Sequence, residues 1–375
     1  MRPSIQEGNE ARSTKSFPFY RFSGTHRQIG QQFGETCQEL IRKHRDYALE
    51  RLRSQTSISS RQALEEAAMR YRPYVIQHAG FFDEEIQGIA EGAGISLAEA
   101  YLLQLRAELA RDLAMSSECT TFAVLPEATS EGTGLIGQNA DLPAFYSELG
   151  VVAEFVPNDA PAQLMLTPAG QVSYIGINHQ GGGVFANFLT CDDWRVGFPR
   201  YLLSRLALMH GSVEEAIAAV RSVHRASSRN LIMLDRHGKA ADLETTAARD
   251  ALIEPVAGLL VHSNHYITEE LQQEERLPEQ LLENSRVRLS RMRSLLEGKR
   301  GQLNAQVMQT ILRDRETYPH PLCVAPGDAP YQTPGDQGAD IITFASVIAE
   351  PGKGRLWIAI GPPHQYEYKC YSFSS

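Results

Sequence analysis

Residues 116–122 read SSECTTF, and the sequence pattern changes from helix-like to strand-like at this stretch. Upstream of it the sequence follows helical patterns. Downstream, short runs rich in β-branched and aromatic residues alternate with Gly, Pro, Asn and Asp. Cys119 stands at the junction, so it is either an ordinary buried thiol or a nucleophile placed at the start of a strand block.

The region from residue 25 to about 115 is predicted to be helical. Thr25 with Gln28, and Ser96 with Glu99, have the spacing of a capping box, in which two residues three apart satisfy each other's free backbone donors. Apolar residues recur at helical intervals after the first cap, which predicts one buried stripe.

Six strand-like runs follow Cys119 and predict a meandering antiparallel sheet. They are CTTFAVLP (119–126), GLIGQNADL (134–142), VVAEFVP (151–157), AQLMLTP (162–168), VSYIGIN (172–178) and GGVFANFL (182–189). The three glycines at 181–183 lack the Lys-Ser/Thr of a phosphate-binding loop and favour a tight turn or close backbone approach.

Helices and strands also alternate in blocks along the rest of the chain. The expected elements are a helical region at 198–223, a hairpin at 230–246, a strand within 258–266, a helical stretch from about 269 to 316, and final strands at 339–350 and 354–361. This order predicts an α+β fold in which two mostly antiparallel sheets lie between helical layers.

Composition excludes several classes of protein. A net charge of −9 argues against a nucleic-acid-binding surface, and no apolar run reaches the roughly 18 residues of a membrane span. We expect a cytoplasmic protein with no nucleic-acid or membrane partner. Five widely spaced cysteines without a CxxC pair argue against a disulfide framework or a structural zinc site.

A thiol near its free pKa of about 8.5 needs a base beside it to attack a carbonyl. None of the histidines stands in a recognisable cysteine-protease signature. If Cys119 became the first residue of its chain, its own α-amine, with a pKa of about 7.7 to 8.0, would serve as the base. That design requires cleavage of the Glu118–Cys119 bond.

The motifs ECTTF (118–122) and GQNADL (137–142) resemble those of the acyl-coenzyme A:6-aminopenicillanic acid acyltransferase family. These are the C45 peptidases, within the N-terminal nucleophile hydrolases. GINHQGGGVFANFL, RNLIMLDRHGKAADLETT, VHSNHY, NSRVRLSRMRSLL and ITFASVI recur in the family's order. The resemblance covers most of the chain and implies an αββα sandwich with self-cleavage before Cys119.

The resemblance also implies roles for individual residues. Cys119 would be both the self-cleaving and the catalytic nucleophile, oriented by Thr120 and Thr121. Asp141 would hydrogen-bond near the new amine, and Asn264 would donate to the oxyanion, for which a neutral amide is suited. Residues 1–118 would form a helical pro-region and 119–375 the catalytic part of one structural domain, and the two fragments would remain associated.

This chain departs from the family's pattern in two places. Glu118 stands where the best-known fungal member has glycine, and Ala140 and Leu142 stand where the family often has an aromatic residue and a Trp. The second difference weakens any transfer of substrate preference, because those positions can line the pocket.

Other polar residues have both structural and functional interpretations. Asn139 and Asp141 also suit turns, Asn187 suits a structural position in its strand, and Glu244 suits a buried, hydrogen-bonded carboxylate near the site. Asn139, Asn187, Glu244 and Arg288 are also candidates for substrate binding, with Arg288 a candidate carboxylate clamp.

His262 and His265 are three apart, which invites a zinc interpretation. In an extended segment that spacing turns the two rings to opposite faces, and no third ligand is indicated. We therefore expect no metal and no cofactor.

The leading hypothesis is a self-processing cysteine hydrolase of small linear amides that acts through an acyl-Cys119 thioester. The alternatives are an acyltransferase that uses acyl-coenzyme A or an amide donor, an uncleaved binding protein, and a Cys-His enzyme that needs no cleavage. Each takes a small-molecule partner, and self-association is left open.

Overall fold

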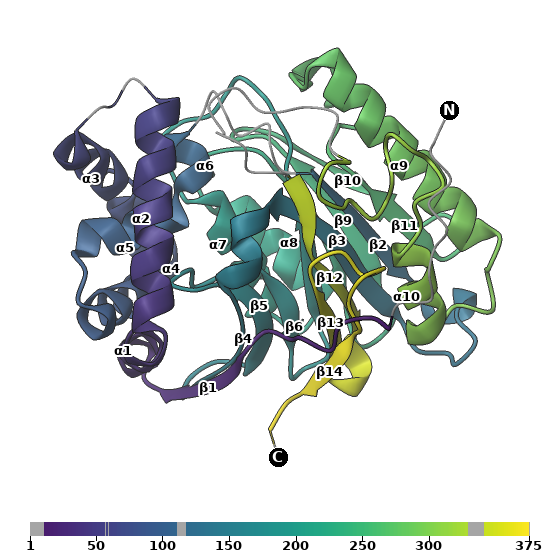
Figure 1. Cartoon of the computed structure of the whole chain (residues 1–375), viewed down its shortest axis with the longest axis horizontal. Coiled ribbons are helices and arrows are strands. Elements are labelled where there is room, and N and C mark those ends of the chain that lie inside the picture. The colour runs from purple at the N-terminus through teal and green to yellow at the C-terminus, as the bar shows by residue number, and fades with distance from the viewer. Residues whose placement is uncertain (1–10, 57, 59, 111–117, 329–340, 375) are drawn as a thin grey trace.

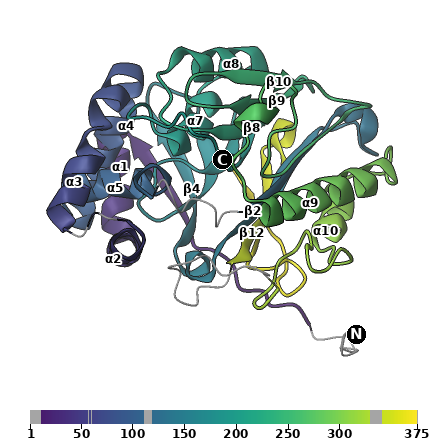
Figure 2. The same cartoon turned by 90° about the horizontal axis from the view of Figure 1, so that it is seen from above.

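The computed structural model describes residues 11–56, 58, 60–110, 118–328 and 341–374. Two β-sheets pack face to face, and helices cover the outer side of each (Figure 1, and turned by 90° in Figure 2). The strand orders are β1-β4-β5-β6-β7-β8-β9-β10 and β11-β2-β3-β12-β13-β14. The predicted α+β sandwich is confirmed.

The eight-stranded sheet is antiparallel except where β1 runs parallel to β4. Its strands are β1 (Phe19–Gly24), β4 (Gly150–Pro157), β5 (Gln163–Pro168), β6 (Ile175–Asn178), β7 (Gly183–Asn187), β8 (Arg229–Leu234), β9 (Ala240–Thr245) and β10 (Asp250–Ile253).

The six-stranded sheet is antiparallel throughout. Its strands are β2 (Glu118–Val124), β3 (Leu135–Pro143), β11 (Leu259–His262), β12 (Ile341–Glu350), β13 (Arg355–Ile360) and β14 (Lys369–Ser372). The six runs predicted after Cys119 are thus all strands, but β2 and β3 belong to one sheet and β4 to β7 to the other.

Most described helices lie on the side of the eight-stranded sheet. They are α1 (His26–Thr36), α2 (Gln38–Gln55), α3 (Arg61–Met69), α4 (Arg72–Ala93), α5 (Leu97–Gln104), α6 (Arg106–Leu109), α7 (Arg200–Leu208) and α8 (Val213–Ser222). The six-stranded sheet is covered by α9 (Glu279–Glu297) and α10 (Ala305–Leu312). Short 3-10 turns are η2 (Pro126–Ala128), η3 (Ala144–Glu148), η4 (Gln272–Glu274) and η5 (Pro351–Lys353).

Three hydrophobic clusters fill the three interfaces between the four layers. In β8, Leu231 and Met233 pack toward the helices, whereas Ile232 and Leu234 pack toward the other sheet. This alternation follows from the two-residue period of a strand. Because both faces of each sheet are covered, these strands are apolar on both sides.

The sequence interpretation missed β1, β10 and β14. All three are edge strands with exposed positions, so their apolar pattern is weak. The helical stretch predicted from about 269 to 316 is interrupted as well. Pro278 precedes α9, and a turn with Gly301 at φ +80° separates α9 from α10, a conformation that favours glycine.

Both capping boxes predicted in the N-terminal region are present, at Thr25 and at Ser96. The turn predicted at the triple glycine also forms, with Gly181 at φ +90° directly before β7. Among the described helices, none is long and apolar enough to cross a membrane.

Glycines let α1 and α4 pack with their backbones in close approach. A Cβ atom on Gly88 would lie 2.3 Å from the carbonyl oxygen of Arg27, and one on Gly30 would lie 2.0 Å from that of Glu85. Backbone atoms cannot move aside as a flexible side chain can, so each added methyl would force the helices apart.

We expect Gly88→Ala to lower the free energy of unfolding by on the order of 1–3 kcal/mol, as overpacking does. Urea denaturation measures it. Gly80→Ala, next to the kink of α4 at Ala79, is the control for adding a methyl group, since a Cβ there meets nothing within 4 Å and little loss of stability is expected. Equal effects of the two substitutions would contradict the packing argument.

Candidate active site

Cys119 lies near the start of β2, between the two sheets, with 4% of its surface exposed. Alternation along β2 turns Cys119 and Thr121 toward the eight-stranded sheet and Thr120 toward α9. The thiol contacts Gln138 of β3, whose Nε2 lies 3.8 Å from Sγ. The Gln138 Oε1 accepts a hydrogen bond from the backbone of Ala186, which fixes the amide.

Asn264 follows β11 and holds the backbone nitrogen of Cys119. The Cys119 N–H donates to Oδ1 of Asn264 over 2.8 Å, and Nδ2 of Asn264 donates to the carbonyl of Phe188 over 3.1 Å. The sequence interpretation assigned Asn264 to the oxyanion. The structure brings it to Cys119 through its oxygen, and one N–H of Nδ2 is used by Phe188.

Arg288 of α9 donates hydrogen bonds to both Asn264 and Cys119. Its Nη2 donates to Oδ1 of Asn264 over 2.9 Å, and its Nη1 donates to the carbonyl of Cys119 over 2.7 Å and to Thr120 Oγ1 over 2.9 Å. Nε donates to Asn284 over 2.7 Å. Arg288 is 1% exposed, and its N–H groups donate to atoms of the protein. They do not bind the substrate carboxylate that was expected from the sequence.

Asn187 of β7 joins the two sheets beside the nucleophile. Its Nδ2 donates to the Cys119 carbonyl over 3.0 Å, while its Oδ1 accepts from Thr121 over 2.6 Å and from Asn230 over 3.1 Å. Asn187 and Arg288 therefore both donate to the carbonyl of Cys119, one from each side of β2.

Asp141 and Asn139 lie on the face of β3 that points away from the thiol. Asp141 pairs in register with Glu118 and accepts a hydrogen bond from Thr343 over 2.6 Å. Asn139 donates to the carbonyls of Leu312 and Leu322 and is fully buried. The substrate-binding expectation for Asn139 is therefore corrected, because its odd position in β3 turns it toward α10.

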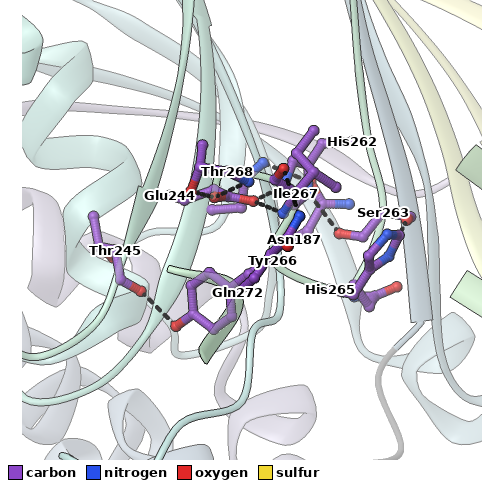
Figure 3. A network of polar contacts seen from close by, with 12 residues as sticks. Asn187, Glu244, Thr245, His262, Ser263, His265, Tyr266, Ile267, Thr268 and Gln272 are labelled. Atoms are coloured by element: carbon purple, nitrogen blue, oxygen red, sulfur yellow. Dashed lines mark hydrogen bonds and ion pairs between the residues drawn. The ribbon is translucent and has the colours of Figure 1, made fainter. Parts of the chain in front are cut away.

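Glu244 of β9 is the centre of a buried network behind Asn187 (Figure 3). Its carboxylate accepts hydrogen bonds from His262 Nε2 over 2.8 Å, from the Ile267 N–H over 2.6 Å, and from the backbone and hydroxyl of Thr268. These partners occupy both carboxylate oxygens. Glu244 therefore holds the end of β11 and the segment after Asn264, and it is not aimed at a substrate.

A second cluster fixes the backbone at Asn264. Ser285 of α9 accepts from the Asn264 N–H over 2.8 Å and contacts Ser263 over 2.8 Å and His265 Nδ1 over 2.7 Å. His262 and His265 thus have separate partners, Glu244 and Ser285 (Figure 3 labels both rings). Among the described residues no group of three or more His, Cys, Asp or Glu side chains is arranged to hold a metal ion.

The electrostatics of the site keep the thiol protonated. Burial, and secondarily the charge of Asp141, raise the pKa of Cys119 to about 12. His262 is no base for it, because its two ring nitrogens both donate, to the Ser263 carbonyl and to Glu244. In the uncleaved chain the nitrogen of Cys119 is an amide without basicity, so the thiol has no base among the described contacts.

Sequence reasoning missed Gln138 and Ser285. Gln138 stands in the same motif as Asp141, and the two-residue period of β3 places it on the face of Cys119. Ser285 follows Asn284 within the motif NSRVRL, where the spacing of three to Arg288 puts both on one helix face.

Comparison with known proteins gives a family match and structural resemblances. Residues 128–363 match the family model described as acyl-coenzyme A:6-aminopenicillanic acid acyl-transferase. The chain is 29% identical over 307 residues to the acyl-coenzyme A:6-aminopenicillanic-acid-acyltransferase 40 kDa form of Emericella nidulans, and the match covers 80% of this chain and 83% of that protein.

Solved structures that resemble this chain include a hydrolase and an acylase. A mutant of conjugated bile acid hydrolase from Clostridium perfringens is 15% identical, with a TM-score of 0.44 over 68% of this chain and 97% of that chain. Penicillin V acylase from Agrobacterium tumefaciens is 14% identical, with a TM-score of 0.43 over 64% and 83%. These scores are too low to support an argument.

The buried pair of His262 and Glu244 makes stability depend on pH. Burial alone would lower the pKa of His262, but Asp242 and Glu244 raise it to about 9. A raised folded-state pKa contributes stability below the unfolded value of about 6.5 that is lost as the pH rises toward 9. We expect His262→Gln to remove this loss of stability, which is on the order of 3 kcal/mol for a pKa raised from 6.5 to about 9.

Denaturant unfolding of both proteins between pH 6.5 and 9 measures the difference. Comparing the two cancels the groups that His262 does not influence. Asp242 does not cancel, because His262 lowers the pKa of this buried carboxyl, which burial raises to about 6, and the substitution removes that influence. Parallel curves for His262→Gln and the unchanged protein would show that His262 is not a buried imidazolium.

Proposed function

Because the chain belongs to the acyl-coenzyme A:6-aminopenicillanic acid acyl-transferase family, we propose that it is a self-processing cysteine enzyme that cleaves linear amides through an acyl-Cys119 thioester. The observation that carries the proposal is the hydrogen bond from the Cys119 nitrogen to Asn264. It holds in place the one atom that would become a base after cleavage of the Glu118–Cys119 bond.

The proposed self-cleavage uses the thiol of Cys119 and the peptide bond that precedes it. Sγ of Cys119 adds to the carbonyl carbon of Glu118, the C–N bond to Cys119 breaks, and the thiol proton ends on the released amine. Water then hydrolyses the thioester, which leaves fragments of 118 and 375 − 118 = 257 residues. Asn264 and Arg288 support this step by fixing the nitrogen and the carbonyl of Cys119 on either side of the reacting atoms.

After cleavage the α-amine of Cys119 would take the thiol proton, since its ordinary pKa of about 7.7 to 8.0 suits a base at neutral pH. One amine N–H would still donate to Oδ1 of Asn264, which leaves the lone pair for the proton. The second N–H of Asn264 Nδ2 is the proposed donor to the oxyanion, a contribution of roughly 2.7–4 kcal/mol in comparable sites.

We propose that the two fragments remain associated. The parallel pairing of β1 with β4, and the packing of α1 to α5 on the eight-stranded sheet, join residues from both sides of the cleavage point into one core. Separation would expose that core to water. One structural domain made of residues 1–118 and 119–375 is therefore the form in which the enzyme would act.

Whether water or an amine accepts the acyl group is a separate step. The family description and the relative from Emericella nidulans favour transfer as a second candidate, and transfer shares every step up to the thioester. Hydrolysis of a small acylated amine is the function we propose first, because water is the only acceptor that this reaction needs.

The denatured intact mass of the purified protein is expected to show fragments split between Glu118 and Cys119, because the thiol is placed beside its own preceding peptide bond. Cys119→Ala should remain one chain of 375 residues. Cys323→Ala, which changes another buried thiol, is the matched control and should split as the unchanged protein does.

A single full-length chain in all three samples would contradict self-processing. Activity of that intact chain would then favour a Cys-His enzyme, and its absence would favour a binding protein.

With phenylacetyl-amides as substrates, we expect the rate of free acid release to be unchanged when an acceptor amine is added. Chromatography of the products measures the ratio of acid to new amide. Formation of new amide in proportion to the amine would overturn hydrolysis in favour of transfer.

A further inference from the structure

Three arginines from separate elements surround one tyrosine inside the sandwich. Arg106 of α6, Arg200 of α7 and Arg229 of β8 lie with their guanidinium carbons 4.8, 4.9 and 5.0 Å from the ring centre of Tyr201. Arg200 and Arg229 are each 2% exposed. The phenol oxygen of Tyr201 accepts hydrogen bonds from Arg106 over 3.1 Å and from Arg200 over 3.2 Å.

These guanidinium groups have donors without acceptors. Nη2 of Arg106, Nε and Nη1 of Arg200, and Nε of Arg229 are buried and form no hydrogen bond. Among the described residues, none of the three forms an ion pair with a carboxylate. Glu108 lies close by. Its Oε1 accepts from the backbone N–H of Arg200 and from Ser227, and its Oε2 is buried without a hydrogen-bond partner.

Two other buried arginines of the chain have acceptors for their N–H donors. Arg205 forms a buried ion pair with Glu85 and also donates to Gln163 and the Val172 carbonyl. Arg225 donates to the backbone carbonyls of Val220, Thr246 and Arg249. Buried charges in proteins are ordinarily paired in this way, because an uncompensated charge in the core is strongly destabilising.

Aromatic rings offset only part of the cost of the three unpaired arginines. The Arg200 guanidinium lies 4.3 Å from the ring centre of Phe188 and 5.7 Å from that of Trp194, and Arg106 lies 4.3 Å from that of Tyr146. Cation–π contacts are weaker than a charge-assisted hydrogen bond to an anion. Tyr201 supplies no full charge at neutral pH, although the three arginines overcome the effect of burial and lower its pKa to about 8.

The arginine cluster adjoins the proposed nucleophile. Phe188, whose ring stacks on Arg200, accepts the hydrogen bond from Nδ2 of Asn264. The charge of Arg229 acts on the thiol of Cys119 and on Tyr174 alike. Cys119, Tyr174, Phe188 and Tyr201 all belong to the cluster of side chains between the two sheets.

We propose that Arg106, Arg200 and Arg229 form a carboxylate-binding subsite, so that the substrate is an amide bearing a carboxylate group. The assignment to a substrate rests on the proposed function of Cys119, whereas the anion site itself does not. A planar carboxylate would accept the free N–H donors of the guanidinium forks, and the rings of Phe188, Trp194 and Tyr146 would enclose the apolar part of the same molecule.

The direct test is anion binding without catalysis. We expect benzoate to raise the Tm of the processed protein more than benzamide at equal ionic strength, since the two probes differ in charge and not in shape. In Arg200→Met the difference between benzoate and benzamide should vanish. The Tm of this variant without ligand should equal or exceed that of the unchanged protein, because an unpaired buried charge is replaced by an apolar side chain.

Arg225→Met is the matched control, since Arg225 is also buried but fully hydrogen-bonded. Its Tm should fall, and its preference for benzoate should remain. The proposal is overturned if the unchanged protein does not distinguish benzoate from benzamide, or if Arg200→Met still does.

Substrate preference separates this subsite from the function of Cys119. Phenylacetylglycine should be cleaved with a kcat/KM about ten-fold or more above that of phenylacetylglycinamide, the span of one charge-assisted hydrogen bond, and the loss in Arg200→Met should appear in KM. Benzoate binding without any amide cleavage would refute the proposed function and leave the anion site. Cleavage of both amides at equal rates would refute the carboxylate-bearing substrate.

Discussion

The hydrogen bond between the backbone nitrogen of Cys119 and Oδ1 of Asn264 ties the two halves of the site together. Cys119 comes from β2 and Asn264 from the segment after β11, and these adjacent strands bring residues 145 positions apart into contact. Arg288 then binds both the Asn264 oxygen and the Cys119 carbonyl. One amide orientation is thereby imposed on Asn264, because its oxygen faces two donors.

The layers of the fold explain why so polar a site can be buried. Each strand turns alternate residues to opposite interfaces, so β2 presents Cys119 to the space between the sheets and Thr120 to α9. Cys119, Asn264 and Arg288 find hydrogen-bond partners within the protein. The arginines around Tyr201 leave buried donors unused, and in the proposed subsite an anion from outside would pair with them as Glu85 pairs with Arg205.

Much of the fold followed from local patterns in the sequence. The capping boxes at Thr25 and Ser96, and the strand runs after Cys119, could be read because they depend on neighbours a few residues apart. The division of those strands between two sheets could not, since it depends on which strand pairs with which. The edge strands were missed because their exposed positions weaken the alternation of apolar and polar residues that identifies a strand.

The site was predictable to the extent that its residues stand in motifs. Cys119 and Asn264 were singled out from the sequence, and the structure brings them together. The contacts of Arg288 and Glu244 were not predictable, because a buried arginine and a surface arginine look alike in a sequence. Asn139 was misplaced for a related reason: side-chain direction in β3 depends on the register with β12, which places Asn139 opposite Ser346.

We propose that processing leaves the α-amine of Cys119 free beside its thiol. The most direct measurement is reaction of the denatured protein with 2-cyanobenzothiazole, which condenses with a 1,2-aminothiol at a chain terminus and not with an internal cysteine. The account predicts a single stable adduct, on a fragment of 257 residues that begins at Cys119. A catalytically active protein that forms no such adduct would contradict it.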